Sequence, residues 1–326
     1  MFNIKLKIIK TRTKRIIKYS KQDIKNSINI AESSFGLFKY ILKMFVLLFF
    51  GLLIIFPLFF MIWMSLIPED VIANSNGNEN IPLFNSFDKL TLDNFKYALN
   101  SGYIKALLLT ILMMCTSVVL RVLFSLTFGY AFSLRNWKFK KISWLIFLAI
   151  LVLPEVALLS GQYRVIVALD WKNNELLLLS LTLPFAASVF SGYLYRIAFE
   201  SIPQSVRDTG KIDGSSEFRF FIKILLPLVK PTTLLVMILT AFAAWNSYAW
   251  PNLIINNSSS DFWDLLNLWI FRTGYKIMNG ENQSIISIKM AASFLAIMPM
   301  MIIYIIFRKT IIRAITNNKF KVTSKS

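Results

Sequence analysis

The chain has 326 residues, of which 56% are hydrophobic and only 16% are charged, and its formal net charge is +19. It contains no histidine and a single cysteine, Cys115, which excludes histidine bases, histidine metal ligands and an internal disulfide. Long apolar runs in such a chain indicate that it crosses a membrane, and they argue against a soluble enzyme.

Six segments meet the requirement for a transmembrane helix, which is about 20 mostly apolar residues. In chain order they cover residues 41–66, 104–133, 142–165, 176–195, 224–250 and 285–307. We therefore predict an all-α integral membrane protein with six transmembrane helices. Its expected parts are a basic segment at 1–40, a first transmembrane helix at 41–66, an outer loop at 67–103, a five-helix core at 104–307 that includes a loop at 196–226, and a basic tail at 308–326.

The distribution of basic residues predicts the orientation of these spans. Of the 36 Lys and Arg residues, 27 lie in the segments 1–43, 135–141, 196–230 and 308–326, and only seven lie on the opposite side. Because cytoplasmic loops are enriched in Lys and Arg, we predict a protein of the cell membrane with both termini in the cytoplasm. The basicity thus reflects topology and indicates no nucleic-acid partner, and the lysine-rich N-terminal segment is expected to lie against anionic membrane lipids.

The predicted cytoplasmic loop at 196–226 has a pattern of its own. Pro203 can begin a short helix, because its missing N–H costs little in the first turn. Gly214 can end that helix in a left-handed conformation. An amphipathic connector follows from Glu217, and Pro227 and Pro231 mark where the chain bends into the next span. A short surface helix between two spans is suited to transmit a push from another protein.

At these residues the sequence resembles the cytoplasmic loop of ABC importer permeases. The family pattern is Glu-Ala-Ala, three residues, Gly, and a Leu-Pro about a dozen residues later. The corresponding residues here are Asp208, Thr209, Gly210, then Gly214, then Leu226 and Pro227. Asp replaces Glu at 208, and Thr-Gly replaces the Ala-Ala pair. Ile202-Pro203, Asp213-Gly214, Phe218 and Pro231 also match the fuller form of the pattern, which is typical of carbohydrate importers.

Further matches outside the loop extend the resemblance from about residue 100 to the C-terminus. They are Gly129-Tyr130-Ala131-Phe132, Trp245-Asn246, Trp250-Pro251 and Met290-Ala291-Ala292. These segments are similar to the carbohydrate-uptake permeases, the group that includes the smaller maltose-transporter permease and the glycerol-3-phosphate and multiple-sugar permeases. The resemblance implies the type I ABC importer permease fold, with a cytoplasmic coupling helix and a sugar, oligosaccharide or polyol phosphate as substrate.

The resemblance also implies partners. These are a second permease subunit, expected to be a different chain, two cytoplasmic ABC ATPase subunits and an extracellular solute-binding protein. The sequence has no Gly-x4-Gly-Lys-[Ser/Thr] phosphate loop, so ATP and Mg are expected on the ATPase subunits and no cofactor on this chain. The chain is thus predicted to have no catalytic, cofactor or metal site. The residues expected to couple it to the ATPase are Arg207, Asp208, Thr209, Gly210, Asp213, Gly214 and Phe218.

Two ionisable residues lie inside the predicted spans and are therefore functional candidates. Arg121 and Glu155 each lie about 13 residues from the inner end of their span, roughly 20 Å deep. They are candidates for an ion pair between the second and third spans. Such a pair could fix the register of the helices or line the translocation path, and the sequence leaves both roles open.

Aromatic residues near the outer surface are candidates for contact with substrate or binding protein. They are Trp245, Tyr248, Trp263 and Trp269, together with the amide of Asn246. Aromatic faces stack on sugar rings, whereas the competing interpretation for Trp245 and Tyr248 is an interfacial aromatic belt.

Two alternative functions remain open at this stage. A permease for peptides or amino acids would have the same architecture. A secondary transporter would need no ATPase, and the sequence shows neither inverted repeats nor coupled ion sites that would favour one.

Overall fold

The computed structural model describes residues 34–68, 90–153, 155–171, 175–206, 208, 216–255, 264–278 and 281–322. The chain divides into two compact units, Met1–Trp63 and Met64–Ser326. In the first unit, α2 (Ser34–Leu66) is a single helix about 50 Å long that continues through Pro57. Beyond Lys43 its exposed side chains are apolar, as expected for a helix that lipid surrounds.

The second unit begins at Met64, in the last turn of α2. Asn94 binds this end, because its Nδ2 donates to the carbonyl oxygens of Ser65 at 2.9 Å and Ile67 at 2.8 Å. The short α4 (Asp93–Ala98) leads through a π-helical turn, η2 (Leu99–Tyr103), into the long α5 (Ile104–Ser133). Gly102 in this turn has φ of 91°, a conformation that favours glycine and that kinks the chain before α5.

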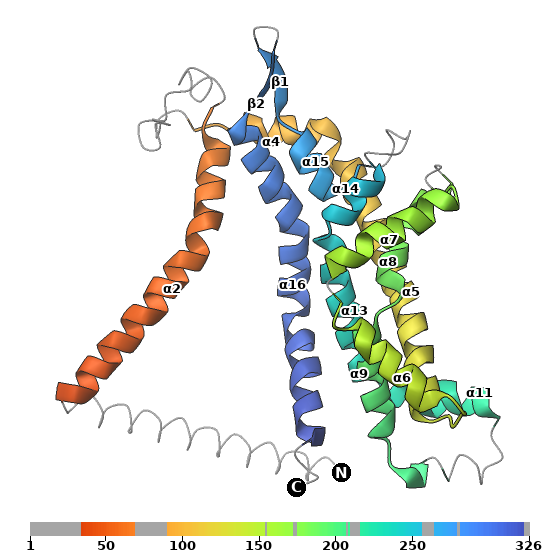
Figure 1. Cartoon of the computed structure of the whole chain (residues 1–326). Coiled ribbons are helices and arrows are strands. Elements are labelled where there is room, and N and C mark those ends of the chain that lie inside the picture. The colour runs from red at the N-terminus through yellow and green to blue at the C-terminus, as the bar shows by residue number, and fades with distance from the viewer. Residues whose placement is uncertain are drawn as a thin grey trace, which may run out of the picture. The chain divides into compact units, whose positions relative to one another are not determined.

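Two pairs of shorter helices follow (Figure 1). The first pair is α6 (Lys140–Ile150) and α7 (Glu155–Ala168). The second pair is α8 (Leu177–Ala186) and α9 (Val189–Glu200), which bend by 50° at Ala187 and Ser188. Ser188 caps α9 with its side-chain oxygen, which accepts from the N–H of Ser191 at 3.2 Å.

The chain then returns to the bundle through a bent connector. It consists of α11 (Glu217–Phe220), the π-helical η3 (Phe221–Leu225) and α12 (Leu226–Leu228). A bend of 72° separates this connector from α13 (Lys230–Trp245). Pro227 and Pro231 flank the bend, where the sequence predicts it.

The remaining elements are α14 (Ala249–Ile255), α15 (Leu266–Arg272), the strands β1 (Tyr275–Met278) and β2 (Glu281–Ser284), and α16 (Ile286–Val322). The strands form an antiparallel hairpin that pairs Tyr275 with Ser284 and Met278 with Glu281. This hairpin departs from the predicted all-α chain, although the protein is otherwise helical over its described residues. Three buried clusters hold the second unit together, and α5 contributes to all three.

The predicted spans are only partly continuous helices. Among the described residues, Gly36–Leu66, Asp93–Ser133 and Ile286–Lys309 are long and apolar enough to cross a membrane, and each of the two bent pairs can count as one more span. The predicted span 142–165 is instead two helices, α6 and α7. The count of six is therefore not confirmed. The physical reason is Pro154, which lacks an N–H and disfavours helical backbone in the residue before it.

Candidate functional site

The C-terminal end of α9 and the helix α11 lie at the same end of the bundle, which we call the coupling end (Figure 1). Helical backbone begins at Gln204, directly after Pro203, and includes Val206 and Asp208. Arg207, Thr209, Gly210, Asp213 and Gly214 lie outside the described residues. Their predicted contact with an ATPase stays a prediction.

The chain before and after the segment that links α9 to α11 contributes side chains to one buried hydrophobic cluster, which we call the anchor cluster. From α9 and the chain just after it, Tyr195, Phe199 and Ile202 enter the cluster. Leu225 of η3, Val229 just before α13 and Val236 within α13 also enter it, and α5 contributes Leu126. Tyr195, Phe199 and Leu225 are fully buried. Because a close-packed cluster transmits displacement, a push on the segment would reach α5, α9 and α13 together.

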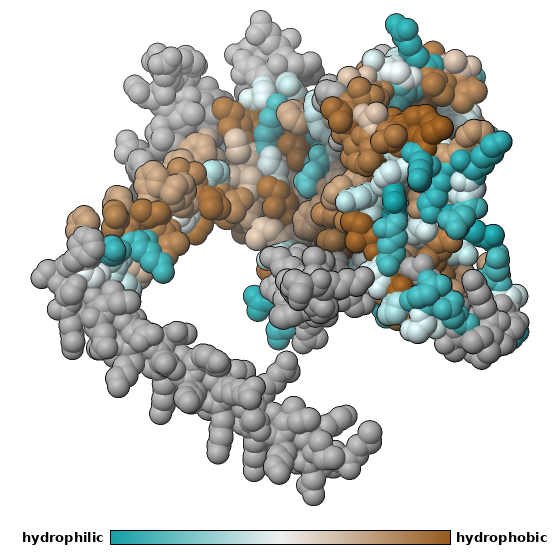
Figure 2. Space-filling model, turned by 60° about the horizontal axis from the view of Figure 1, so that its bottom comes forward, coloured by the Kyte–Doolittle hydropathy of each residue, from teal (hydrophilic) through white to brown (hydrophobic). Residues whose placement is uncertain are grey.

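The described part of the segment is exposed around this anchor. The side-chain amide of Gln204 donates through Nε2 to Asp208 Oδ1 at 3.1 Å, one helical turn away. Phe218 is 74% exposed. Figure 2 shows hydrophilic side chains gathered over the right-hand part of the bundle, among apolar ones.

An ion pair joins the start of the connector to another loop of the coupling end. Arg135, just after α5, donates to Glu217 in the first turn of α11. Ser216 caps the same helix, because its Oγ accepts from the N–H of Arg219 at 3.4 Å. The sequence pattern did not reveal the ion pair, since its partners are 82 residues apart. Their opposite charges were the only available signal.

Close packing of α5 against α9 supports the anchor cluster. A Cβ added to Gly129 would lie 2.4 Å from the Cβ of Tyr195, and one added to Gly192 would lie 2.4 Å from the ring of Phe128. Two glycines thus let the helices approach closely. The Arg196 guanidinium lies 4.1 Å from the centre of the Trp144 ring, which ties α9 to α6.

Arg121 has a contact of its own within the bundle. Its Nε donates to the backbone carbonyl of Phe185, which lies just before α8 ends. At a helix end this carbonyl lacks its usual partner, so Arg121 compensates for the break between α8 and α9. Glu155 begins α7, but its side chain lies outside the described residues, and the predicted pair with Arg121 stays a prediction.

The aromatic candidates fall into two groups. Trp245 and Trp269 are buried, with 4% and 2% exposure, and both belong to the cluster formed around α4, α15 and α16. The Nε1 of Trp269 donates to the carbonyl of Ser101 at 2.9 Å. Both indoles therefore serve packing in this conformation, and the predicted contacts with substrate or binding protein stay predictions.

The second aromatic group is accessible. Asn246 is exposed, and its Nδ2 donates to the carbonyl of Phe242 at 2.9 Å. Tyr248 is exposed and lies 4.9 Å from the ring of Phe271, measured between centres. Trp263 lies outside the described residues. Of the five candidates, only Asn246 and Tyr248 present an exposed side chain in the described part of the chain.

Fold and site together define a multi-pass membrane protein whose bundle is anchored to an exposed segment at one end. Residues 121–317 match the family described as the binding-protein-dependent transport system inner membrane component. The match covers more than half of the chain, and the chain belongs to this family. It is therefore a permease subunit of an ABC importer and not a catalytic enzyme.

Individual relatives agree with this family. The chain is 44% identical over 283 residues to a probable ABC transporter permease protein of Mycoplasma pneumoniae, which covers 84% of this chain and 86% of that protein. It is 27% identical over 285 residues to the arabinooligosaccharides transport system permease protein AraQ of Bacillus subtilis, which covers 86% of this chain and 95% of that protein.

A solved structure has the same fold. It is the crystal structure of a bacterial ABC transporter involved in the import of the acidic polysaccharide alginate. The TM-score is 0.66 at 18% sequence identity, and the match covers 85% of this chain and 98% of that chain. At this identity the similarity shows the fold alone.

Proposed function

We propose that this permease subunit forms part of the translocation path for a carbohydrate, either a sugar, an oligosaccharide or a polyol phosphate. The relation to AraQ supports this substrate class, since that protein serves arabinooligosaccharide transport. The resemblance of Trp245-Asn246 and Met290-Ala291-Ala292 to the carbohydrate-uptake permeases agrees with it.

The second part of the proposal is that ATPase motion enters the bundle through the Ile202–Phe218 segment. The observation that carries it is that Ile202, the first residue of the segment, and Leu225, which follows the segment, lie in the anchor cluster with α5 and α13. Asp208 would pair with a basic ATPase residue, and the exposed Phe218 would enter an apolar groove on the ATPase. Closure of the ATPase pair would then shift the spans between inward-facing and outward-facing states.

The full assembly follows from this role. Two ATPase subunits carry ATP and Mg on the cytoplasmic side, and a second permease of different sequence completes the path. A solute-binding protein delivers substrate on the outer side. The chain lies in the cell membrane with both termini in the cytoplasm, as its distribution of Lys and Arg favours.

The test is substrate-stimulated ATP hydrolysis by the reconstituted transporter. Asp208→Lys, Gly214→Pro and Phe218→Ala should each uncouple hydrolysis from substrate or prevent assembly with the ATPase. Phe139→Ala is the matched control, because Phe139 is also an exposed phenylalanine at the coupling end but lies outside the segment. Unchanged stimulation in all three variants would contradict the proposed coupling role.

The substrate class has a separate test. Competition of labelled sugars, polyol phosphates, peptides and amino acids for uptake would distinguish the carbohydrate proposal from a peptide or amino-acid permease. Uptake that persists without the ATPase would favour a secondary transporter and would contradict the whole proposal.

A further inference from the structure

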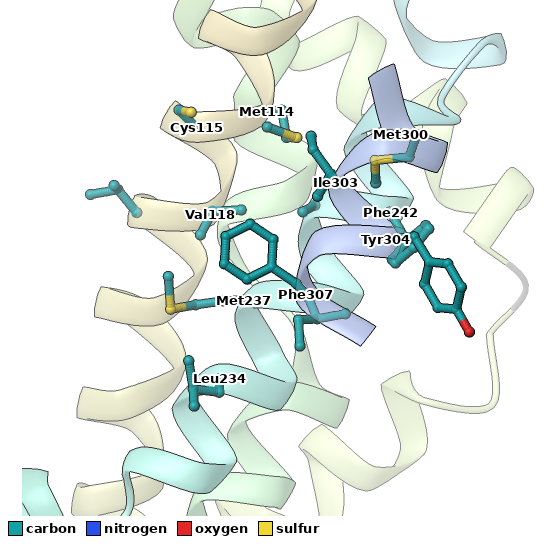
Figure 3. A pocket seen from close by; sticks show the side chains of 13 residues that line it. Met114, Cys115, Val118, Leu234, Met237, Phe242, Met300, Ile303, Tyr304 and Phe307 are labelled. Carbon is teal, nitrogen blue, oxygen red and sulfur yellow. The ribbon is translucent and has the colours of Figure 1, made fainter. Parts of the chain in front are cut away.

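An apolar groove lies among α5, α13 and α16, with a volume of about 410 Å³. Figure 3 shows its walls: Met114, Cys115 and Val118 from α5, Leu234 and Met237 from α13, and Met300, Ile303 and Phe307 from α16. The hydroxyl of Tyr304 points away from the other side chains in this view. The groove therefore offers hydrocarbon and sulfur surface and almost no hydrogen-bonding groups.

This lining does not suit the proposed substrate. A site for a carbohydrate needs several convergent polar groups to replace the water around its hydroxyls. A groove without such groups would instead accept an apolar chain. Three methionines from three different helices line it, and their flexible side chains adapt to the shape of such a chain.

The surroundings of the groove indicate where that chain comes from. Its three walls belong to apolar helices, and Val119, Tyr304 and Phe307 at the groove are exposed on the surface of this unit. In a membrane, lipid acyl chains cover such surfaces.

Three cationic side chains lie at the coupling end of the groove. Lys230 precedes Leu234 by one helical turn on α13, and Arg308 and Lys309 directly follow Phe307 on α16. All three side chains are exposed, and within the described part of the chain none of them takes part in an ion pair. Cations at the end of an apolar groove complement the phosphate of an anionic lipid headgroup.

We propose that this groove binds one anionic phospholipid of the membrane leaflet at the coupling end. One acyl chain lies between α5, α13 and α16, and the headgroup phosphate meets Lys230, Arg308 and Lys309. The lipid fills the space where α16 separates from α5 and α13, and it would move with these helices during transport. The proposed lipid site requires only that the protein is inserted in a membrane, and it does not depend on the class of substrate that is transported.

The test is photo-crosslinking of the assembled transporter in vesicles. The probes are phosphatidylglycerol and phosphatidylcholine with the same diazirine-labelled acyl chain, and peptide mapping locates the adducts. We expect adducts concentrated on the groove residues, with roughly tenfold enrichment of phosphatidylglycerol over phosphatidylcholine. The triple variant Lys230→Gln, Arg308→Gln, Lys309→Gln should lose the enrichment and keep some adducts.

A matched pair of tryptophan variants tests the groove itself. Met237→Trp narrows the groove and should reduce adducts there, whereas Leu239→Trp, on an exposed part of the same helix outside the groove, should leave them unchanged. If Met237→Trp does not assemble, the triple charge variant still decides the question. Adducts spread evenly over all exposed apolar positions would overturn the proposal. The proposal would also be overturned if a helix of the second permease covered the groove and kept adducts from forming there. The groove would then serve the packing of the two subunits.

Discussion

Single polar contacts stabilise breaks in otherwise apolar helices. The carbonyl of Phe185 is freed where α8 ends, and Arg121 donates to it. We predict that Arg121→Met lowers the free energy of unfolding by about 1–3 kcal/mol, because it leaves this carbonyl without its donor. Thermal unfolding of the purified protein measures the change. Arg164→Met on α7 is the control, since Arg164 is exposed and should have little effect.

Asp264 provides a second residue-scale prediction, in the loop before α15. Burial raises the pKa of its carboxyl group, and the nearby Arg272, whose Nη1 lies 3.5 Å from Oδ1, only partly opposes this. A raised pKa means that the folded state favours the protonated acid. The stability contributed by protonation is therefore present at low pH and is lost as the pH rises through the raised pKa.

Asp264→Asn should remove this pH dependence. Its thermal unfolding should match that of the wild type below about pH 4, the ordinary range of the group, and should exceed it progressively at higher pH. Arg272→Gln should move the transition to still higher pH, because it removes a cation that lowers the pKa of Asp264. A wild-type protein that gains stability relative to Asp264→Asn on going from pH 4 to pH 7 would contradict this account.

At the scale of elements, the packing of α5 on α9 depends on glycine. We predict that Gly129→Ala destabilises the protein by about 1–3 kcal/mol, because its Cβ would meet the Tyr195 Cβ and the backbone of Arg196. Gly161→Ala on α7 is the matched control. A Cβ at Gly161 has no neighbour within 4 Å, so alanine should be neutral or stabilising by up to about 1 kcal/mol. Thermal unfolding of both variants gives the comparison.

Hydropathy predicted some elements of this bundle better than others. It located α2, α5 and α16 because their apolar runs are long and uninterrupted. Proline predicted the bend before α13, where Pro227 and Pro231 flank Val229. The division of 142–165 into α6 and α7 was missed, because an apolar run with an internal proline can be either a kinked or a broken helix. Ser188 was the available signal for the start of α9, since serine is a common N-cap.

The candidate site was predictable only in its local part. The spacing of the motif residues predicted the Ile202–Phe218 segment, because these residues lie close together in the sequence. The anchor cluster, the Arg135–Glu217 ion pair and the contact of Arg121 with Phe185 join residues from distant parts of the chain. Amphipathic periodicity predicts which face of a helix is buried, but it does not predict which other helix covers that face.

At the scale of the whole molecule, the anchor cluster and the lipid groove share α5 and α13. Leu126 of α5 and Val236 of α13 belong to the anchor cluster, while Cys115 and Met237 of the same helices line the groove. A shift of these helices driven from the coupling end would therefore change the groove as well. With the proposed coupling role and lipid site, this arrangement would make the transport cycle sensitive to the lipid composition of the leaflet at the coupling end.

The orientation of the molecule yields the last prediction. With 27 basic residues on one side of the spans and seven on the other, the coupling end should face the cytoplasm. Because Cys115 is the only cysteine, Cys115→Ala gives a cysteine-free protein in one step. In that background, a membrane-impermeant maleimide should label Ser284→Cys, at the end of β2, in intact cells. Ser216→Cys, at the start of α11, should react only after the cells are opened. The reverse pattern would place the Ile202–Phe218 segment out of reach of a cytoplasmic ATPase, and it would contradict the coupling proposal together with the topology.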